Sequence, residues 1–174
     1  MDTEQPRPTA PPSRSRVLVV ADWSADAQAI VSACERHDKE QSASFGLIVP
    51  GWLHGLDWVG DSTAGLPCAR RQLERIKGLP TPPGLSFAVA GVRDPDVVAA
   101  ICDATADWPA DELLLCPPAR RLDVAHVLDL SHRAQRLTGL PVRRIAVPAP
   151  AAAHGGAWLS LRGGHCAIEC ALAA

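Results

Sequence analysis

Runs of consecutive apolar residues alternate with amphipathic segments along this chain. The first run, Val17 to Ala21, has no polar residue at alternate positions, so it predicts a strand that is covered on both faces. Such a strand lies in the middle of a parallel sheet. Four later runs predict further strands at residues 45–49, 85–89, 113–116 and 142–147.

Apolar residues at helical spacing fill the segments between these runs. Ser24 is expected to cap the first helix, and Asp94 with Pro95 marks the start of the third. Residues 52–65 show no clear period and are predicted to form a loop. The four predicted helices lie near residues 25–40 and 66–78, between residues 94 and 108, and near residues 122–138.

Five strands that alternate with four helices predict an α/β fold, a three-layer doubly wound parallel sheet with right-handed crossovers. Arg143 and Arg144 interrupt the last apolar run, which favours an edge position for that strand. Residues 15–148 are expected to form this domain. Before it, residues 1–14 are rich in proline and are expected to be disordered. After it, residues 149–174 form a tail rich in alanine and glycine, either flexible or an additional edge strand.

The net charge, the length of the apolar runs and the cysteine spacing indicate which partners and which cellular location to expect. A net charge of −2 and a pI near 6.3 give no electrostatic reason to expect nucleic acid or an anionic membrane as a partner. No apolar run approaches the roughly 20 residues of a membrane-spanning helix. The six cysteines lack the short paired spacings of a disulfide framework or a zinc site, so we expect reduced thiols, no bound metal and a cytoplasmic location.

Candidate chemistry gathers where the predicted strands end. An open α/β sheet binds ligands beyond the carboxyl ends of its strands, and Asp22 and Ser24 follow the first strand directly. Either these two residues contact a ligand, or Asp22 only ends the strand and Ser24 only caps the helix. Cys116 ends the fourth run, which favours a buried and inert thiol. Since no nucleophile stands beside a base, the sequence predicts a protein that is not an enzyme.

Four short motifs occur in order along the chain: Asp22-Trp23-Ser24 after the first strand, Gly91 followed by Asp94-Pro95, Ala110-Asp111 before the fourth strand, and Pro141-Val142 at the fifth. In this order they resemble the universal stress protein family. The resemblance implies a sheet with strand order 3-2-1-4-5 and a homodimer that forms through the fifth strand. It also implies a role in the stress response of a bacterial cytoplasm.

The resemblance further implies an adenosine-side pocket built from Asp22, Ser24, Val49, Gly91 and the loop that begins at Cys116. Family members that bind ATP have a glycine-rich loop after the fourth strand, where backbone N–H groups approach the phosphates. Here that loop contains Pro117 and Pro118, which have no N–H group. Arg120 and Arg121 follow them, either to grip an anion through their guanidinium groups or as a solvated pair.

A Gly-Ser pair in the family's ATP-binding members corresponds to Leu128 and Asp129 in this chain. A carboxylate 4 Å from a phosphate charge is repelled by roughly 4 kcal/mol at an effective dielectric constant near 20. These differences predict a non-enzymatic binding or regulatory module with a degenerate ATP site and no cofactor. The alternative is a sensor of a small ligand or adenine nucleotide that retains the adenosine side of the pocket.

Overall fold

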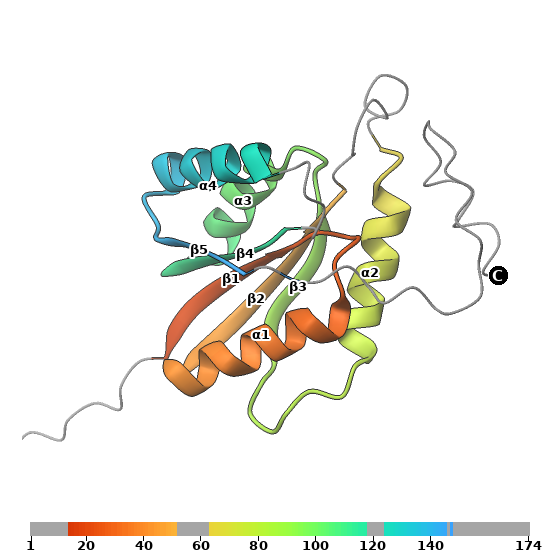
Figure 1. Cartoon of the computed structure of the whole chain (residues 1–174), viewed down its shortest axis with the longest axis vertical. Coiled ribbons are helices and arrows are strands. Elements are labelled where there is room, and N and C mark those ends of the chain that lie inside the picture. The colour runs from red at the N-terminus through yellow and green to blue at the C-terminus, as the bar shows by residue number, and fades with distance from the viewer. Residues whose placement is uncertain (1–13, 52–62, 118–123, 146, 148–174) are drawn as a thin grey trace, which may run out of the picture.

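The computed structural model of the chain describes residues 14–51, 63–117, 124–145 and 147, and for residues 124–128 it describes the backbone alone. Strands and helices alternate along it, as the apolar runs predict (Figure 1). The elements are β1 Ser15–Ala21, α1 Ala27–Glu40, β2 Ala43–Pro50, α2 Leu66–Gly78, β3 Phe87–Arg93, α3 Val97–Asp107, β4 Glu112–Cys116, α4 Val124–Thr138 and β5 Val142–Arg144.

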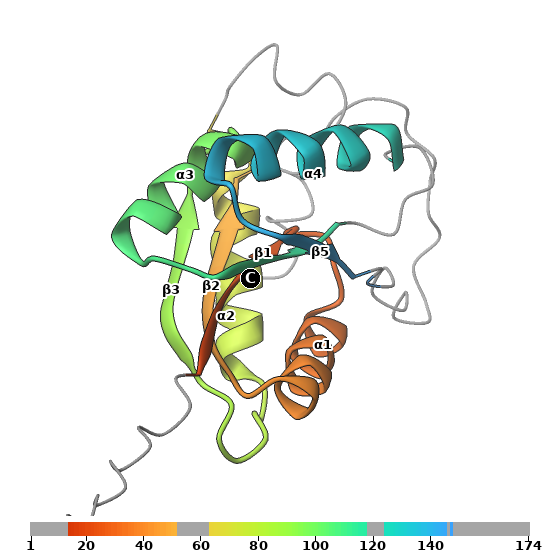
Figure 2. The same ribbon diagram turned by 90° about the vertical axis from the view of Figure 1, so that its left-hand side faces the viewer.

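The five strands form one parallel sheet in the order β3-β2-β1-β4-β5. Helices α1 and α2 cover one face of it, and α3 and α4 cover the other (Figures 1 and 2). The predicted three-layer fold, the strand order and the central position of β1 are confirmed, and β5 lies at an edge. Because the chain moves outward in opposite directions from β1, the switch point of the sheet lies between β1 and β4.

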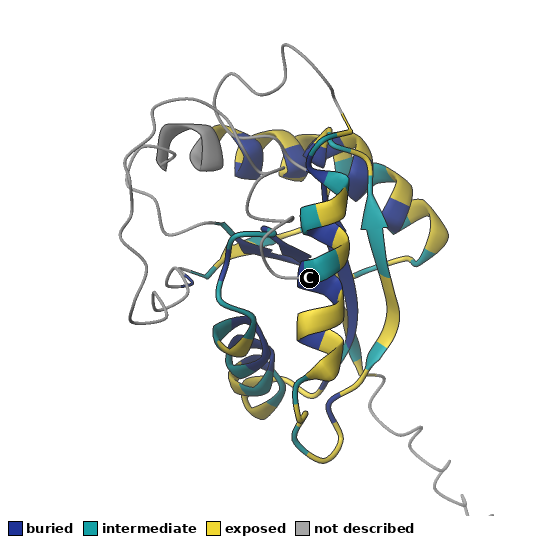
Figure 3. Cartoon of the chain, turned by 90° about the vertical axis from the view of Figure 1, so that its right-hand side faces the viewer, coloured by how far each residue is buried: buried dark blue, intermediate teal, exposed yellow. Residues whose placement is uncertain are grey.

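The core consists of two apolar layers, one on each face of the sheet (Figure 3). Val17 and Val19 of β1 pack toward α1 and α2, whereas Leu18 and Val20 pack toward α3 and α4. All four side chains are at most 5% exposed. This two-sided burial explains why the run has no alternating polar positions.

The N-terminus of α1 differs from the prediction. Asp26 caps the helix, and its carboxylate accepts a hydrogen bond of 2.8 Å from the backbone N–H of Ala29. The expectation that Ser24 caps α1 is therefore wrong. Ser24 instead donates both its N–H and its hydroxyl to the carboxylate of Asp22, because that turn lies one step before the helix.

The start of α3 is also displaced by two residues. Asp96 is its cap and accepts hydrogen bonds from the N–H groups of Val98 and Ala99, at 2.8 and 3.2 Å. Asp94, the predicted cap, accepts a bond from the N–H of Asp96 and forms the turn before the helix. Both aspartates can cap a helix, and the one next to the first helical residue does so.

β3 and β5 end three or more residues from their predicted ends, and the other three strands extend one or two residues beyond their predicted bounds. β3 begins and ends later than residues 85–89, because its residues from Val89 to Arg93 pair with β2 beyond a register shift between Phe45 and Gly46. β5 is shorter than residues 142–147 and pairs with β4 over three residues, Val142–Arg144. Most of the predicted loop at residues 52–65 lies outside the described residues, as do the N-terminal and C-terminal segments.

The cysteines are only partly as expected. Cys34, Cys102 and Cys116 are free thiols, but Cys68 on α2 is disulfide-bonded, so the expectation of six reduced thiols is wrong. Among the described residues, no helix has both the length and the apolar character needed to span a bilayer.

Candidate functional site

A pocket opens at the switch point of the sheet, beyond the carboxyl ends of β1 and β4. Its cavity volume is about 20 Å³, which is room for about one water molecule. Apart from the Asp22 carboxylate and the Cys116 thiol, the described side chains around it are apolar, and none of them is basic. The lining residues are Val20, Ala21, Asp22, Pro50, Val97, Leu115, Cys116, Pro117 and Leu130.

Asp22 is the buried acid of this pocket and is 4% exposed. Its backbone N–H donates to the carbonyl oxygen of Cys116 at 3.1 Å, which continues the β1–β4 ladder to the rim. Its Oδ1 accepts bonds of 2.7 Å from the N–H and 2.5 Å from the hydroxyl of Ser24. Asp22 and Ser24 are thus brought together, and the serine fixes the orientation of the carboxylate at the pocket wall.

Cys116 is the last residue of β4, lies beside Asp22 at the pocket and is 1% exposed. Burial raises the pKa of its thiol above the ordinary value of 9.0, and a nearby Cys34 thiolate would raise that pKa further. Burial also raises the pKa of Cys34 to about 12. Both thiols therefore remain protonated at neutral pH, and a protonated thiol is a poor nucleophile and metal ligand. The predicted burial of Cys116 is confirmed.

Two residues of the expected adenosine side lie away from the lining. Val49 is fully buried in β2, within the core layer under α1 and α2. Gly91 lies in β3, and a Cβ added to it would meet no atom within 4 Å. Neither residue borders the pocket. The structure therefore groups Asp22, Ser24 and Cys116 at the switch point and leaves Val49 and Gly91 in their strands.

Of the residues expected to lie near a phosphate, the structure describes the side chain of Asp129. Asp129 lies on α4 with its side chain 66% exposed, and its Oδ2 is 3.9 Å from Nη1 of Arg133. Solvent and this arginine screen the carboxylate, so the repulsion of a phosphate expected from Asp129 is weak. The next residue, Leu130, faces the pocket instead. Arg120 and Arg121 lie outside the described residues.

Among the lining residues that the sequence analysis did not assign to a site are Pro50, Val97 and Leu130. Pro50 is the last residue of β2, and Val97 is the first residue of α3. Strand ends and the following helix starts meet at one edge of a parallel sheet, and that rule could have identified these two residues. For Leu130 the sequence carries no such signal, because it lies in the second turn of α4.

No protein-family model matches the chain, and no curated protein matches it either. Among solved structures, a crystal structure described as a universal stress protein in complex with cAMP matches with a TM-score of 0.46 and 15% sequence identity. The match covers 77% of this chain and 98% of that chain. The chain is similar in fold to a universal stress protein. At this identity the similarity concerns the fold alone, so the binding properties of the pocket rest on its own residues.

Proposed function

We propose that this chain is a non-enzymatic binding or regulatory module, of the universal stress protein type, with a degenerate ATP site. The observation that carries this proposal is the pocket at the switch point, where one buried carboxylate faces apolar walls. Polyphosphate sites need backbone N–H groups or basic side chains that point at the anion. The described lining offers no basic residue, and the chain leaves β4 through Pro117, which has no N–H group to donate.

Three features of the pocket region support a role without catalysis. The Cys116 thiol stays protonated, so it is not an activated nucleophile. The hydroxyl of Ser24 donates a hydrogen bond of 2.5 Å to Asp22, and Ser24 is not itself among the described lining residues. No histidine occurs among the described lining residues to act as a base.

The alternative function is a sensor of a small ligand or an adenine nucleotide that keeps the adenosine side. The buried Asp22 favours this alternative, because a carboxylate at the end of β1 accepts hydrogen bonds from a ligand's N–H groups. The cavity volume of about 20 Å³ holds only a compact group in the present conformation. A larger ligand would therefore cover the mouth of the pocket or displace its apolar walls.

A homodimer through β5 is part of the same proposal. β5 is the last strand in the sheet order and has β4 as its single neighbour, so its outer edge faces no other strand of the described sheet. Such an edge can pair with an equivalent strand of a second copy. Analytical ultracentrifugation of the full chain tests this, since a monomer at all concentrations would exclude it.

Native mass spectrometry of the purified full chain, followed by thermal shift with adenosine, AMP and Mg-ATP, tests the function. A ligand at 100 times its Kd stabilises the protein by about 2.7 kcal/mol, which is a measurable shift. We expect no carried ligand and no shift with Mg-ATP. A shift with adenosine that Asp22→Asn abolishes would favour the sensor. Asp129→Asn, on the exposed face of α4, is the matched control and should leave every shift unchanged.

A further inference from the structure

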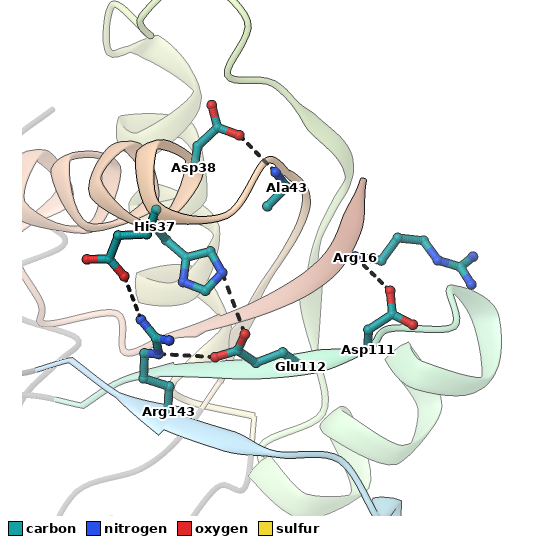
Figure 4. Close-up of polar contacts among 8 residues, drawn as sticks. Arg16, His37, Asp38, Ala43, Asp111, Glu112 and Arg143 are labelled. Carbon is teal, nitrogen blue, oxygen red and sulfur yellow. Dashed lines mark hydrogen bonds and ion pairs between the residues drawn. The ribbon is translucent and has the colours of Figure 1, made fainter. Parts of the chain in front are cut away.

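His37 of α1 is a buried imidazole at the far end of the sheet from the pocket. Its side chain is 1% exposed, and neither Nδ1 nor Nε2 makes a hydrogen bond. The ring packs on Phe45 of β2 with centroids 6.0 Å apart and ring planes at 74°. Figure 4 shows it facing Glu112, the first residue of β4, whose Oε2 lies 3.6 Å from Nε2. Buried polar groups normally have partners, so this ring stands out.

Glu112 connects the histidine to the edge of the sheet. Its side chain is 13% exposed, and its Oε1 is 3.2 Å from Nε of Arg143 in β5. Nη1 of the same arginine is 3.0 Å from Oε2 of Glu40 in α1. The carboxylate of Glu112 therefore lies between a permanent cation on β5 and a titratable ring on α1 (Figure 4).

The other charged groups near His37 have different partners. Oδ1 of Asp38 accepts the backbone N–H of Ala43 at 2.9 Å, and Oδ2 of Asp111 accepts the backbone N–H of Arg16 at 2.8 Å. Both carboxylates tie chain segments to each other and lie apart from the ring in Figure 4. The carboxylate that can respond to the charge of His37 is thus that of Glu112.

We propose that His37 and Glu112 form a proton-operated contact that fastens α1 and β5 to the start of β4. Imidazole is the side chain that ordinarily changes charge between pH 5 and 8. When protonated it donates from both nitrogens, and Nε2–H can form a charge-assisted bond to Glu112. Glu112 then holds a cation on each side, one from α1 and one from β5. Burial opposes the charged ring, and the adjacent carboxylate offsets that cost.

The direction of the pH effect follows from these charges. The ion pair exists only while His37 is protonated and Glu112 is ionised. Its contribution is therefore present while the ring carries the proton and is lost when rising pH removes it. It is also lost in strong acid, where carboxylates become neutral. Within that window, β5 should be held more firmly at the lower pH.

Hydrogen exchange at Ile145 measures this attachment, because its N–H donates to the carbonyl oxygen of Leu115 at 2.9 Å beside β5. We expect Glu112→Gln to lower its protection factor by roughly tenfold more at pH 5.5 than at pH 7.5, the ratio typical of a hydrogen bond to a charged group. The lost pairing with Arg143 contributes equally at both pH values, because arginine stays charged. The pH difference therefore isolates His37.

Glu35→Gln is the matched control, because Glu35 pairs with Lys39 on the exposed side of α1 and should leave Ile145 unchanged at both pH values. A double-mutant cycle that combines Glu112→Gln with His37→Gln should abolish the pH dependence of the protection loss at Ile145. If His37→Gln does not fold, an NMR titration of the His37 ring in the wild type and in Glu112→Gln replaces the cycle. The proposal would be overturned if Glu112→Gln lost the same protection at pH 5.5 and 7.5. It would also be overturned if the His37 ring titrated identically in the wild type and in Glu112→Gln.

Discussion

Two buried thiols should make this fold unstable in alkaline solution. Cys34 is fully buried and Cys116 is 1% exposed. Burial raises the pKa of Cys34 to about 12, and it raises the pKa of Cys116 in the same direction. The chain contains no tyrosine, and its lysines, Lys39 and Lys77, are exposed. Cys34 and Cys116 are therefore the described groups from which we expect an alkaline loss of stability.

The size of the effect follows from proton linkage. Above pH 9 the unfolded chain releases its thiol protons while the folded chain retains them, so the free energy of unfolding falls as pH rises. Each buried thiol contributes a slope of about 1.4 kcal/mol per pH unit until the folded pKa is reached. From pH 9 to 11 two thiols cost about 5 kcal/mol, against a total stability of roughly 5–15 kcal/mol for a domain. The stability is fully present below pH 9.

Urea unfolding followed by tryptophan fluorescence at pH 8, 9, 10 and 11 measures this slope. A reductant in every sample keeps the state of Cys68 the same for all variants. Replacing Cys34 and Cys116 by alanine lowers the stability at pH 8, because cavities form, but it should remove most of the alkaline slope. Cys102→Ala, at a partly exposed site, is the control. Equal slopes in the wild type and the double variant would refute the reasoning.

Two further substitutions test packing and capping. Gly46→Ala should destabilise the fold by about 1–3 kcal/mol, because its Cβ would lie 2.9 Å from the Trp108 ring. Gly91→Ala is the control, because its Cβ would meet no atom within 4 Å. Equal midpoints of urea unfolding for the two variants would contradict this packing. Asp96→Ala should cost about 1 kcal/mol through loss of the α3 cap. A larger loss in Asp94→Ala, measured by the same unfolding curves, would mean that the cap is assigned to the wrong aspartate.

The sequence predicted the layers of this fold well, because burial on both faces leaves a local trace. Val17 to Ala21 and Leu113 to Cys116 contain no polar position, and both strands proved central or next to the centre. Helical spacing likewise predicted α2 at Leu66–Gly78. The strand order came from the family resemblance, since periodicity contains no information about which strands are neighbours.

The boundaries were predicted less well, because they depend on contacts between distant segments. Asp22, Ser24 and Asp26 can each cap a helix, and the choice of Asp26 depends on Ser24 being bound to Asp22. The extent of β3 is set by its pairing with β2 past the register shift at Phe45 and Gly46. Neither feature is encoded in a local pattern.

Part of the site could be predicted from the sequence, and the rest depends on how the helices pack. Asp22 and Cys116 follow from the rule that ligands bind beyond strand ends. Leu130 reaches the pocket through the packing of α4, and Glu112 reaches His37 through the packing of α1 on β4. Helical spacing can place such residues on an inner face, but it does not name their partners.

Isothermal titration of the full chain with Mg-ATP at pH 7.5 tests the proposed loss of triphosphate binding most directly. We predict no binding in the low-micromolar range, because the described pocket has apolar walls, one acid and a proline where a phosphate would need donors. Low-micromolar binding that Asp22→Asn abolishes and Asp129→Asn leaves intact would contradict a degenerate ATP site.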